Sequence, residues 1–287
     1  IDKDGGASGG TVTREDLARM PGRSAASVAS TVGGVQSDAN GNITSVRGSR
    51  DDATYYYIDG IKVRGSTNLP KSAIEEVSVM TGGVPANFGD ATGGIISITT
   101  RGASRVYFGG IEAVTSGIGI NENVYGLDNN GFNLLEGTFS GPLLMRKDSN
   151  GKKTDPILGF FVSGNFNHVL DPRPLAGDQY RLKPSMRDSL IDPSKLGPLR
   201  PTGLGFGAYY NTDFLSPNAF EKVNYRQNVA RTRASLAGKI DVNAGPNMNI
   251  SFGASGSYSD RNGASWESSL MNYNNLANYR DLDWRAY

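Results

Sequence analysis

The C-terminal two-thirds of the chain contains stretches of about ten residues in which apolar and polar side chains alternate. In the clearest stretch, Leu158, Phe160 and Val162 alternate with small or polar residues, and Phe161 is the exception. Similar alternation occurs in residues 135–141, 230–242 and 248–259. A period of two predicts strands, and long strands with one apolar and one polar face are typical of a transmembrane β-barrel. Residues 106–116 alternate poorly and are predicted to be a strand from their position.

A soluble β-sandwich also alternates, so the architecture depends on other features. The polar faces carry Ser, Asn and Arg rather than the Lys, Glu and Thr usual on an exposed sheet. The connections also alternate in length, with a tight turn at residues 243–246, a short link at 146–156 and a long loop at 171–225. Short turns and long loops in alternation favour a membrane barrel. We therefore predict about five barrel strands in residues 104–287.

The first hundred residues show a different pattern of short strands and short helices. Thr13 to Asp16 fits a capping box, and Asp59-Gly60 predicts a hairpin turn. Two apolar alternating segments, Val77 to Met80 and Ile95 to Ile98, flank a connection rich in glycine. These elements predict a compact α+β domain over residues 11–103, after a flexible segment at residues 1–10.

The segment from Ile74 to Thr100, IEEVSVMTGGVPANFGDATGGIISITT, resembles the end of the plug domain of TonB-dependent outer-membrane receptors. Three upstream pieces fit the order of that family: Gly33-Gly34-Val35, Val46-Arg47-Gly48 and Tyr57-Ile58-Asp59-Gly60. The string GTFSGPL at residues 137–143, followed by Gly159-Phe160-Phe161, is similar to Bacteroidetes-type receptors of the SusC-like or Oar-like kind.

This resemblance implies an α+β plug domain followed by antiparallel transmembrane strands of a barrel with about 22 strands. About five strands cannot close a barrel, so we expect the chain to be a fragment of a longer polypeptide. The implied location is the outer membrane of a Gram-negative bacterium. The implied function is TonB-dependent active import, with the plug gating the lumen and TonB engaging a segment upstream of Ile1.

The substrate suggested by the large aromatic loop is a bulky solute such as a peptide or an oligosaccharide. An alternative is a plugged barrel that docks an outer-membrane lipoprotein or a secretion machine without transport. A soluble extracellular β-sandwich adhesin is the third hypothesis. Outer-membrane lipid is a further expected partner.

The resemblance also implies a set of plug residues with structural or gating roles. They are Arg47, Gly48, Asp59, Gly60, Glu75, Gly82, Gly89, Gly93, Gly94 and Thr99. The glycines are interpreted as backbone requirements rather than ligand contacts. Arg47, Asp59 and Glu75 have a simpler alternative interpretation, as polar residues at turns and strand ends.

Two further groups are candidates for contacts in the lumen and at the surface. Arg231, Arg233 and Lys239 share the polar face of one predicted strand. We expect Arg231 and Arg233 to pair with plug acids such as Glu75 or Glu76, and the alternative is an anionic solute. The long loop holds more than half of the chain's 13 prolines and many aromatic residues, and it is either a contact lid or a self-packed cover. Its contact candidates are Tyr180, Tyr209, Tyr210 and Phe214.

Composition narrows the choice of function. Glycine is abundant, at 38 of 287 residues, and the net charge of +1 gives no indication of a nucleic-acid surface. Cysteine is absent and His168 is the single histidine, so zinc and thiol chemistry have almost no ligands or nucleophiles to use. No apolar run approaches the roughly 18 residues of a transmembrane helix. We expect no enzyme, no cofactor and no metal site.

Overall fold

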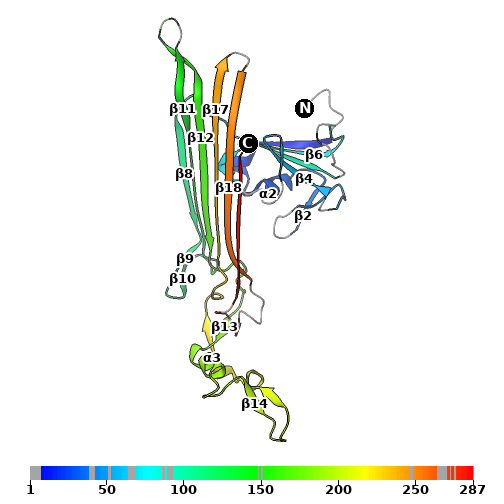
Figure 1. Cartoon of the computed structure of the whole chain (residues 1–287), viewed down its shortest axis with the longest axis vertical. Coiled ribbons are helices and arrows are strands. Elements are labelled where there is room, and N and C mark those ends of the chain that lie inside the picture. The colour runs from blue at the N-terminus through cyan, green and yellow to red at the C-terminus, as the bar shows by residue number, and fades with distance from the viewer. Residues whose placement is uncertain are drawn as a thin grey trace.

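Figure 1 shows the computed structural model of the chain, in which a tall wall of strands has a smaller domain on one side and loops that extend beyond one end. The structure describes residues 8–38, 43–50, 53–63, 69–85, 88, 93–147, 149, 151–245, 248–263, 270–271, 273–274 and 276–286. Among these residues, no helix is both long enough and apolar enough to cross a membrane.

The N-terminal domain is built on a five-stranded sheet with the order β1-β6-β7-β4-β5. Its strands are β1 (Ser8–Thr13), β4 (Tyr55–Ile58), β5 (Ile61–Val63), β6 (Ile74–Gly82) and β7 (Ile95–Thr100). Strands β4 and β7 are parallel, and the other neighbours are antiparallel. Helices α1 (Arg14–Arg19) and α2 (Ala25–Ala29), the hairpin β2 (Val35–Ser37) and β3 (Ile43–Val46), and the short 3₁₀ helix η2 (Lys71–Ala73) complete it.

The local sequence explains these elements. Thr13 and Asp16 form the predicted capping box at the start of α1. Asp59 and Gly60 have φ values of 48° and 83°, which confirms the predicted hairpin turn. Strand β1 begins at Ser8, inside the segment that the sequence predicts to be flexible, and pairs with β6. The core of the domain consists of small and branched apolar side chains, including Leu17, Val28, Ile74, Val77, Val79, Ile96 and Ile98.

The wall is a six-stranded antiparallel sheet with the order β19-β18-β17-β12-β11-β8. Its strands are β8 (Phe108–Thr115), β11 (Phe132–Lys147), β12 (Lys153–Val169), β17 (Arg231–Gly245), β18 (Met248–Gly263) and β19 (Ala277–Ala286). Strand β17 runs through Gly245, so most of the tight turn expected at residues 243–246 is strand.

The two faces of the wall differ as the alternation predicts. The inner face contacts the N-terminal domain and carries Glu136, Ser163, Ser235 and Lys239, among others. The opposite, outer face is apolar, with Leu135, Phe139, Phe166, Leu236 and Ile240 between 45% and 60% exposed. Phe161, the exception in the sequence pattern, lies on the inner face, is 2% exposed and packs into the core of the N-terminal domain.

The two ends of the wall also differ. The end with the links between β11 and β12 and between β17 and β18 is the short-turn end. The opposite, long-loop end carries the hairpin β9 (Gly117–Ile120) and β10 (Asn123–Gly126) and the connection from β12 to β17. In Figure 1 the long-loop end is at the bottom.

The connection from β12 to β17 contains its own secondary structure. It holds β13 (Gln179–Leu182), α3 (Pro184–Ile191), β14 (Leu199–Pro201), β15 (Ala208–Tyr210), β16 (Phe220–Val223) and two 3₁₀ helices, η3 (Asn211–Phe214) and η4 (Pro217–Ala219). Leu182, Leu190 and Ala219 form a small apolar core within it. At its base, the fully buried Asp171 accepts hydrogen bonds from the backbone and guanidinium of Arg226. The connection is therefore a packed unit.

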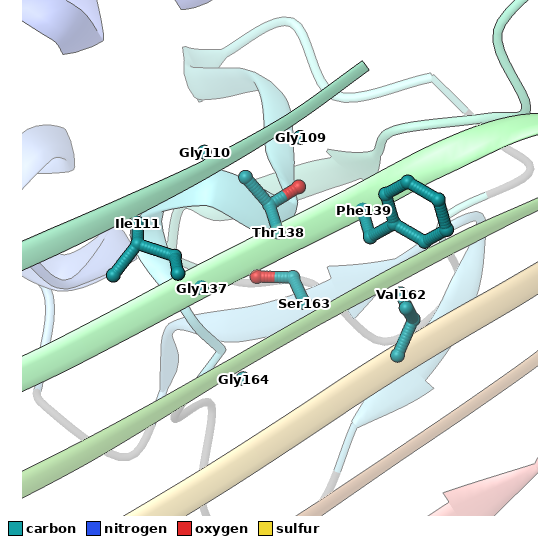
Figure 2. A pocket seen from close by; sticks show the side chains of 9 residues that line it. All are labelled: Gly109, Gly110, Ile111, Gly137, Thr138, Phe139, Val162, Ser163 and Gly164. Carbon is teal, nitrogen blue, oxygen red and sulfur yellow. The ribbon is translucent and has the colours of Figure 1, made fainter. Parts of the chain in front are cut away.

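Figure 2 shows a shallow hollow on the outer face, lined by residues of β8, β11 and β12. Gly109, Gly137 and Gly164 leave its floor without side chains, and Ile111, Phe139 and Val162 stand around it. Directly opposite residues on paired strands point to the same face. Gly137 is opposite Gly164, and Gly109 is opposite Phe139, so all of them face the hollow.

Candidate functional site

The interface between the N-terminal domain and the wall contains three of the predicted site residues, Asp59, Glu75 and Lys239, and each of them forms an ion pair there. Its first contact is an ion pair between Lys239 of β17 and Asp59 of the β4–β5 turn, with a nitrogen–oxygen distance of 3.5 Å. Asp59 also accepts hydrogen bonds from the backbone nitrogen and the hydroxyl of Thr100, at 2.9 and 2.5 Å. Both charged side chains are at least 85% buried, so each depends on the other for neutralisation.

A second contact joins η2 to the middle of the wall. The Ser72 backbone nitrogen donates to Glu136 over 2.7 Å, and the hydroxyls of Ser72 and Ser163 lie 2.5 Å apart. Glu136 is 5% exposed and lies 3.7 Å from the guanidinium of Arg23, which also pairs with Glu112. A carboxylate on the wall is therefore satisfied entirely by groups of the N-terminal domain.

Arg101 lies where the N-terminal domain ends, between the two units. Its guanidinium is 3.6 Å from Glu75 and lies over the rings of Phe108 and Phe161, at 4.5 and 5.3 Å from their centroids. Burial lowers the pKa of Arg101, the positive charge of Arg14 lowers it further, and Glu75 acts in the opposite direction.

The segment after Arg101 is bound to the wall by backbone donors. The nitrogen of Ala103 donates to Asp241 over 2.6 Å, and the nitrogen of Ser104 donates to the Ser140 hydroxyl over 3.1 Å. The Tyr107 hydroxyl donates to the carbonyl of Pro142 over 2.6 Å. The connection thus contacts the inner face at Asp241 and Ser140, and Tyr107 at its end stacks on Phe139 of the outer face.

The predicted plug glycines have structural reasons to be glycine. A Cβ on Gly94 would lie 2.4 Å from a methyl of Val46, and one on Gly93 would lie 2.7 Å from the carbonyl oxygen of Ala53. A Cβ on Gly82 would meet the guanidinium of Arg47. Gly60 has open space around its Cβ position but a positive φ. Gly89 lies outside the described residues.

Arg47 and Gly48 both have positive φ, at 53° and 78°, and form a tight turn in which Ser49 donates to the carbonyl of Val46. The Arg47 side chain lies against Gly82, inside the N-terminal domain. Thr99 is exposed, and its neighbour Thr100 makes the contacts with Asp59.

The predicted pairing of Arg231 and Arg233 with plug acids is wrong. Glu75 pairs with Arg101, and Glu76 accepts a hydrogen bond from Ser78. Arg233 instead lines a cleft of about 340 Å³ between the N-terminal domain and the wall. The cause is position along β17, because Asp59 lies opposite Lys239 while the arginines lie towards the long-loop end.

The aromatic loop candidates lie away from this interface. Tyr180 is on β13, Tyr209 and Tyr210 are on β15, and Phe214 ends η3; all four are at least half exposed. Nearby, Arg181 connects three loops by pairing with Glu122 and Glu221, each at 2.7 Å, and by lying over the ring of Tyr273. No group of three His, Asp or Glu side chains suited to a metal ion occurs in the described part of the chain.

Comparisons with known proteins agree with this architecture. Residues 3–95 match the family model of the TonB-dependent receptor plug domain. The TonB-dependent transporter Oar of Myxococcus xanthus is 29% identical over an alignment of 119 residues, which covers 39% of this chain and 10% of Oar. The chain contains a TonB-dependent receptor plug domain. Its N-terminal domain is the plug.

Solved structures of receptors from Pseudomonas aeruginosa share the fold. A mutant of the ferric enterobactin receptor has a TM-score of 0.53 at 16% identity and matches 91% of this chain and 35% of its own. The ferripyoverdine receptor has a TM-score of 0.54 at 13% identity and matches 91% of this chain and 26% of its own. The chain thus spans about a quarter to a third of these neighbours and a tenth of Oar. It is a protein of the Gram-negative outer membrane, consisting of a plug and antiparallel barrel strands.

Proposed function

We propose that this receptor actively imports a solute across the outer membrane, with TonB displacing the plug to open the lumen. The observation that carries the proposal is the nature of the contact between plug and wall. Many of its contacts are hydrogen bonds and ion pairs, such as Ser72 with Ser163 and Lys239 with Asp59. Each such bond contributes only about 1 kcal/mol net, because water satisfies the same groups once they separate.

In this proposal the short-turn end faces the periplasm and the long-loop end faces outward, as in other outer-membrane barrels. The apolar outer face contacts lipid. TonB is the energy-coupling partner. The plug residues predicted from the sequence then have defined gating roles, in which Asp59 and Lys239 hold the plug and the glycines maintain its fold.

We infer a bulky solute, of the size of a peptide or an oligosaccharide. The aromatic side chains of the long-loop end support this inference, since Tyr209, Tyr210 and Phe214 offer large contact surfaces at low entropic cost. The structural neighbours named above are receptors for ferric enterobactin and ferripyoverdine, so an iron chelate is the other substrate class to test.

A scaffold role without transport is the second candidate. It is favoured by the loop arm, residues 191–214, which extends beyond the end of the wall in Figure 1. Its apolar side chains Ile191, Leu204, Phe206 and Tyr210 are each more than 60% exposed. Exposed apolar patches mark interaction sites on many proteins, and an outer-membrane lipoprotein is a suitable partner.

The two candidates differ in whether the plug moves, and this can be measured without knowing the substrate. Because these 287 residues lack cysteine, the Ser72→Cys variant places one thiol between plug and wall, and any cysteine elsewhere in the full-length receptor is first replaced by serine. We expect a maleimide to label it at least tenfold faster in cells with TonB and a proton gradient than in cells without TonB. The Ser194→Cys variant, on the exposed arm, is the control and should label equally in both.

A Ser72→Cys/Ser163→Cys double variant tests the same movement from the other direction. A disulfide between these positions should abolish the TonB-dependent difference in labelling of a third, plug cysteine, and a reductant should restore it. If Ser72→Cys labels at the same rate with and without TonB, import by plug displacement is wrong and the scaffold role is favoured.

A further inference from the structure

Three arginines gather on the inner face at the long-loop end of the wall. Arg231 of β17 is directly opposite Arg261 of β18, and Arg233 is opposite Ser259. Opposite residues of an antiparallel pair point to the same side. That side is the inner face, because Lys239 follows Arg233 at an even spacing along β17 and reaches Asp59 of the plug.

The described carboxylates around these arginines have other partners. Glu136 pairs with Arg23, Asp171 pairs with Arg226, and Asp260 pairs with Arg280. Asp281, which is opposite Ser259 on β19, forms no ion pair with the three arginines. Like charges placed directly opposite each other destabilise a sheet, so the pair Arg231 and Arg261 is unfavourable unless an anion neutralises it.

The cleft that Arg233 lines combines hydrogen-bond donors with apolar side chains such as Leu69 and Leu134. Its polar lining from the wall includes Asn165, Asn167 and Ser235, and Ser24 and Ser27 contribute from the plug. Glu136 is its one acid among the described residues and is already bonded to Ser72. A volume of about 340 Å³ is sufficient for a small charged group or part of a larger solute.

We propose that Arg233 in the cleft, together with Arg231 and Arg261 next to it on the inner face, binds a soluble anion that carries two or more carboxylate or phosphate groups. The guanidinium of arginine matches both groups with two parallel hydrogen bonds. This inference rests on the proposed import function and names the chemical class of its substrate at the site of entry. The cleft adjoins the plug at Ser24 and Ser27, so a bound anion contacts the part that must move.

The test uses the purified full-length receptor in detergent and isothermal titration with citrate and with inorganic tripolyphosphate. Arg231→Gln and Arg233→Gln should each weaken binding about tenfold, and raised NaCl should weaken binding to the wild type. Arg280→Gln is the matched control. Arg280 is 69% exposed and lies opposite Asp260, on the outer face, so its loss should leave affinity unchanged.

Two further arms decide between a specific site and general positive charge. Arg233→Lys should retain part of the affinity that Arg233→Gln loses, and the heat-dependent mobility of each variant in electrophoresis shows that its barrel is folded. Equal affinity in wild type and Arg233→Gln, or equal loss in Arg280→Gln, overturns the proposal. So does binding of lipid A alone, whose phosphates are the other anions at this surface.

Failure of this inference is distinguishable from failure of import. Maleimide labelling of Ser72→Cys requires no anion, so it reports plug movement whatever the titrations show. Anion binding that depends on Arg233 in a receptor whose plug does not respond to TonB would retain the site and remove the transport role.

Discussion

The two ends of β17 carry cationic side chains on the same inner face but in opposite circumstances. Near the short-turn end, Lys239 pairs with Asp59 of the plug and is largely buried. Near the long-loop end, Arg233 lines a cleft and Arg231 lies opposite Arg261, and neither Arg231 nor Arg233 has an ion-pair partner among the described carboxylates. Alternation along a strand determines which face a charge occupies. The part of the plug that faces the strand determines whether that charge is neutralised. A neutralised charge docks the plug, and a charge without a partner is a candidate for binding solute.

The largest effect on the docked end is expected from Lys239→Met. It leaves the Asp59 carboxylate buried without its cation, at a cost of about 3 kcal/mol in plug docking. The measurement is the urea concentration at which the purified full-length receptor begins to conduct in a planar bilayer, which should fall. Adding Asp59→Asn should recover part of the loss, because the two residues are coupled. An unchanged midpoint in Lys239→Met would show that the ion pair does not hold the plug.

Phe161→Ala tests the apolar part of the same interface. Its ring is buried in the plug core and beneath Arg101, so truncation should cost about 3 kcal/mol by removing packing and the cation–π contact. The control is Phe166→Ala, since Phe166 is 48% exposed on the outer face. Equal midpoints for the two variants in the conductance assay would contradict the inward position of Phe161.

Gly94→Ala perturbs the plug itself rather than its docking. The new methyl would lie 2.4 Å from Val46, and the necessary shift should cost about 2 kcal/mol. The measurement is limited proteolysis of the full-length receptor at increasing temperature, which detects unfolding of the plug. Unfolding should occur at a lower temperature in Gly94→Ala than in the wild type. Gly33→Ala is the control, because nothing lies within 4 Å of its Cβ position. Similar loss in both variants would indicate a general effect of alanine rather than a steric one.

The smallest effect on docking is expected from Arg231→Gln. This residue makes no ion pair with the plug acids Glu75 or Glu76, so the free energy of plug docking should change by less than about 0.5 kcal/mol. The urea concentration at which the receptor begins to conduct should therefore stay almost the same. Its effect should appear only in anion binding. A loss of docking comparable with that of Lys239→Met would erase the difference between the two ends of β17.

Much of this architecture could be predicted from the sequence because its signals are local. The period of two in β11, β12, β17 and β18 is a property of each strand alone, and Asp59-Gly60 specifies its own turn. Phe161 is an exception to this pattern, and only the structure shows that it packs on the plug. The motif from Ile74 to Thr100 indicated a plug domain, and the match over residues 3–95 supports it.

The partners across the interface could not be predicted, because they depend on register between distant segments. Lys239 and Asp59 are 180 residues apart, and Ser72 and Ser163 are 91 apart. Arg231, Arg233 and Lys239 share the polar face of one strand, so the alternation cannot distinguish them. Only the position of the plug along β17 shows that Lys239 has an acidic partner and that the two arginines do not. Arg101, Glu136 and Asp241 carry no local signal beyond being polar, although the alternation alone places Glu136 and Asp241 on the inner face.

The hydroxyl pair of Ser72 and Ser163 has a consequence for the order of events when plug and wall part. Serine hydroxyls are as well solvated as they are bonded to each other, so the first water to enter between them can take over both bonds. The plug and the wall then separate by stepwise hydration of their interface, in which each water molecule lowers the free-energy cost of the next one entering. The ion pair of Lys239 and Asp59 lies further along the same interface, towards the short-turn end of the wall.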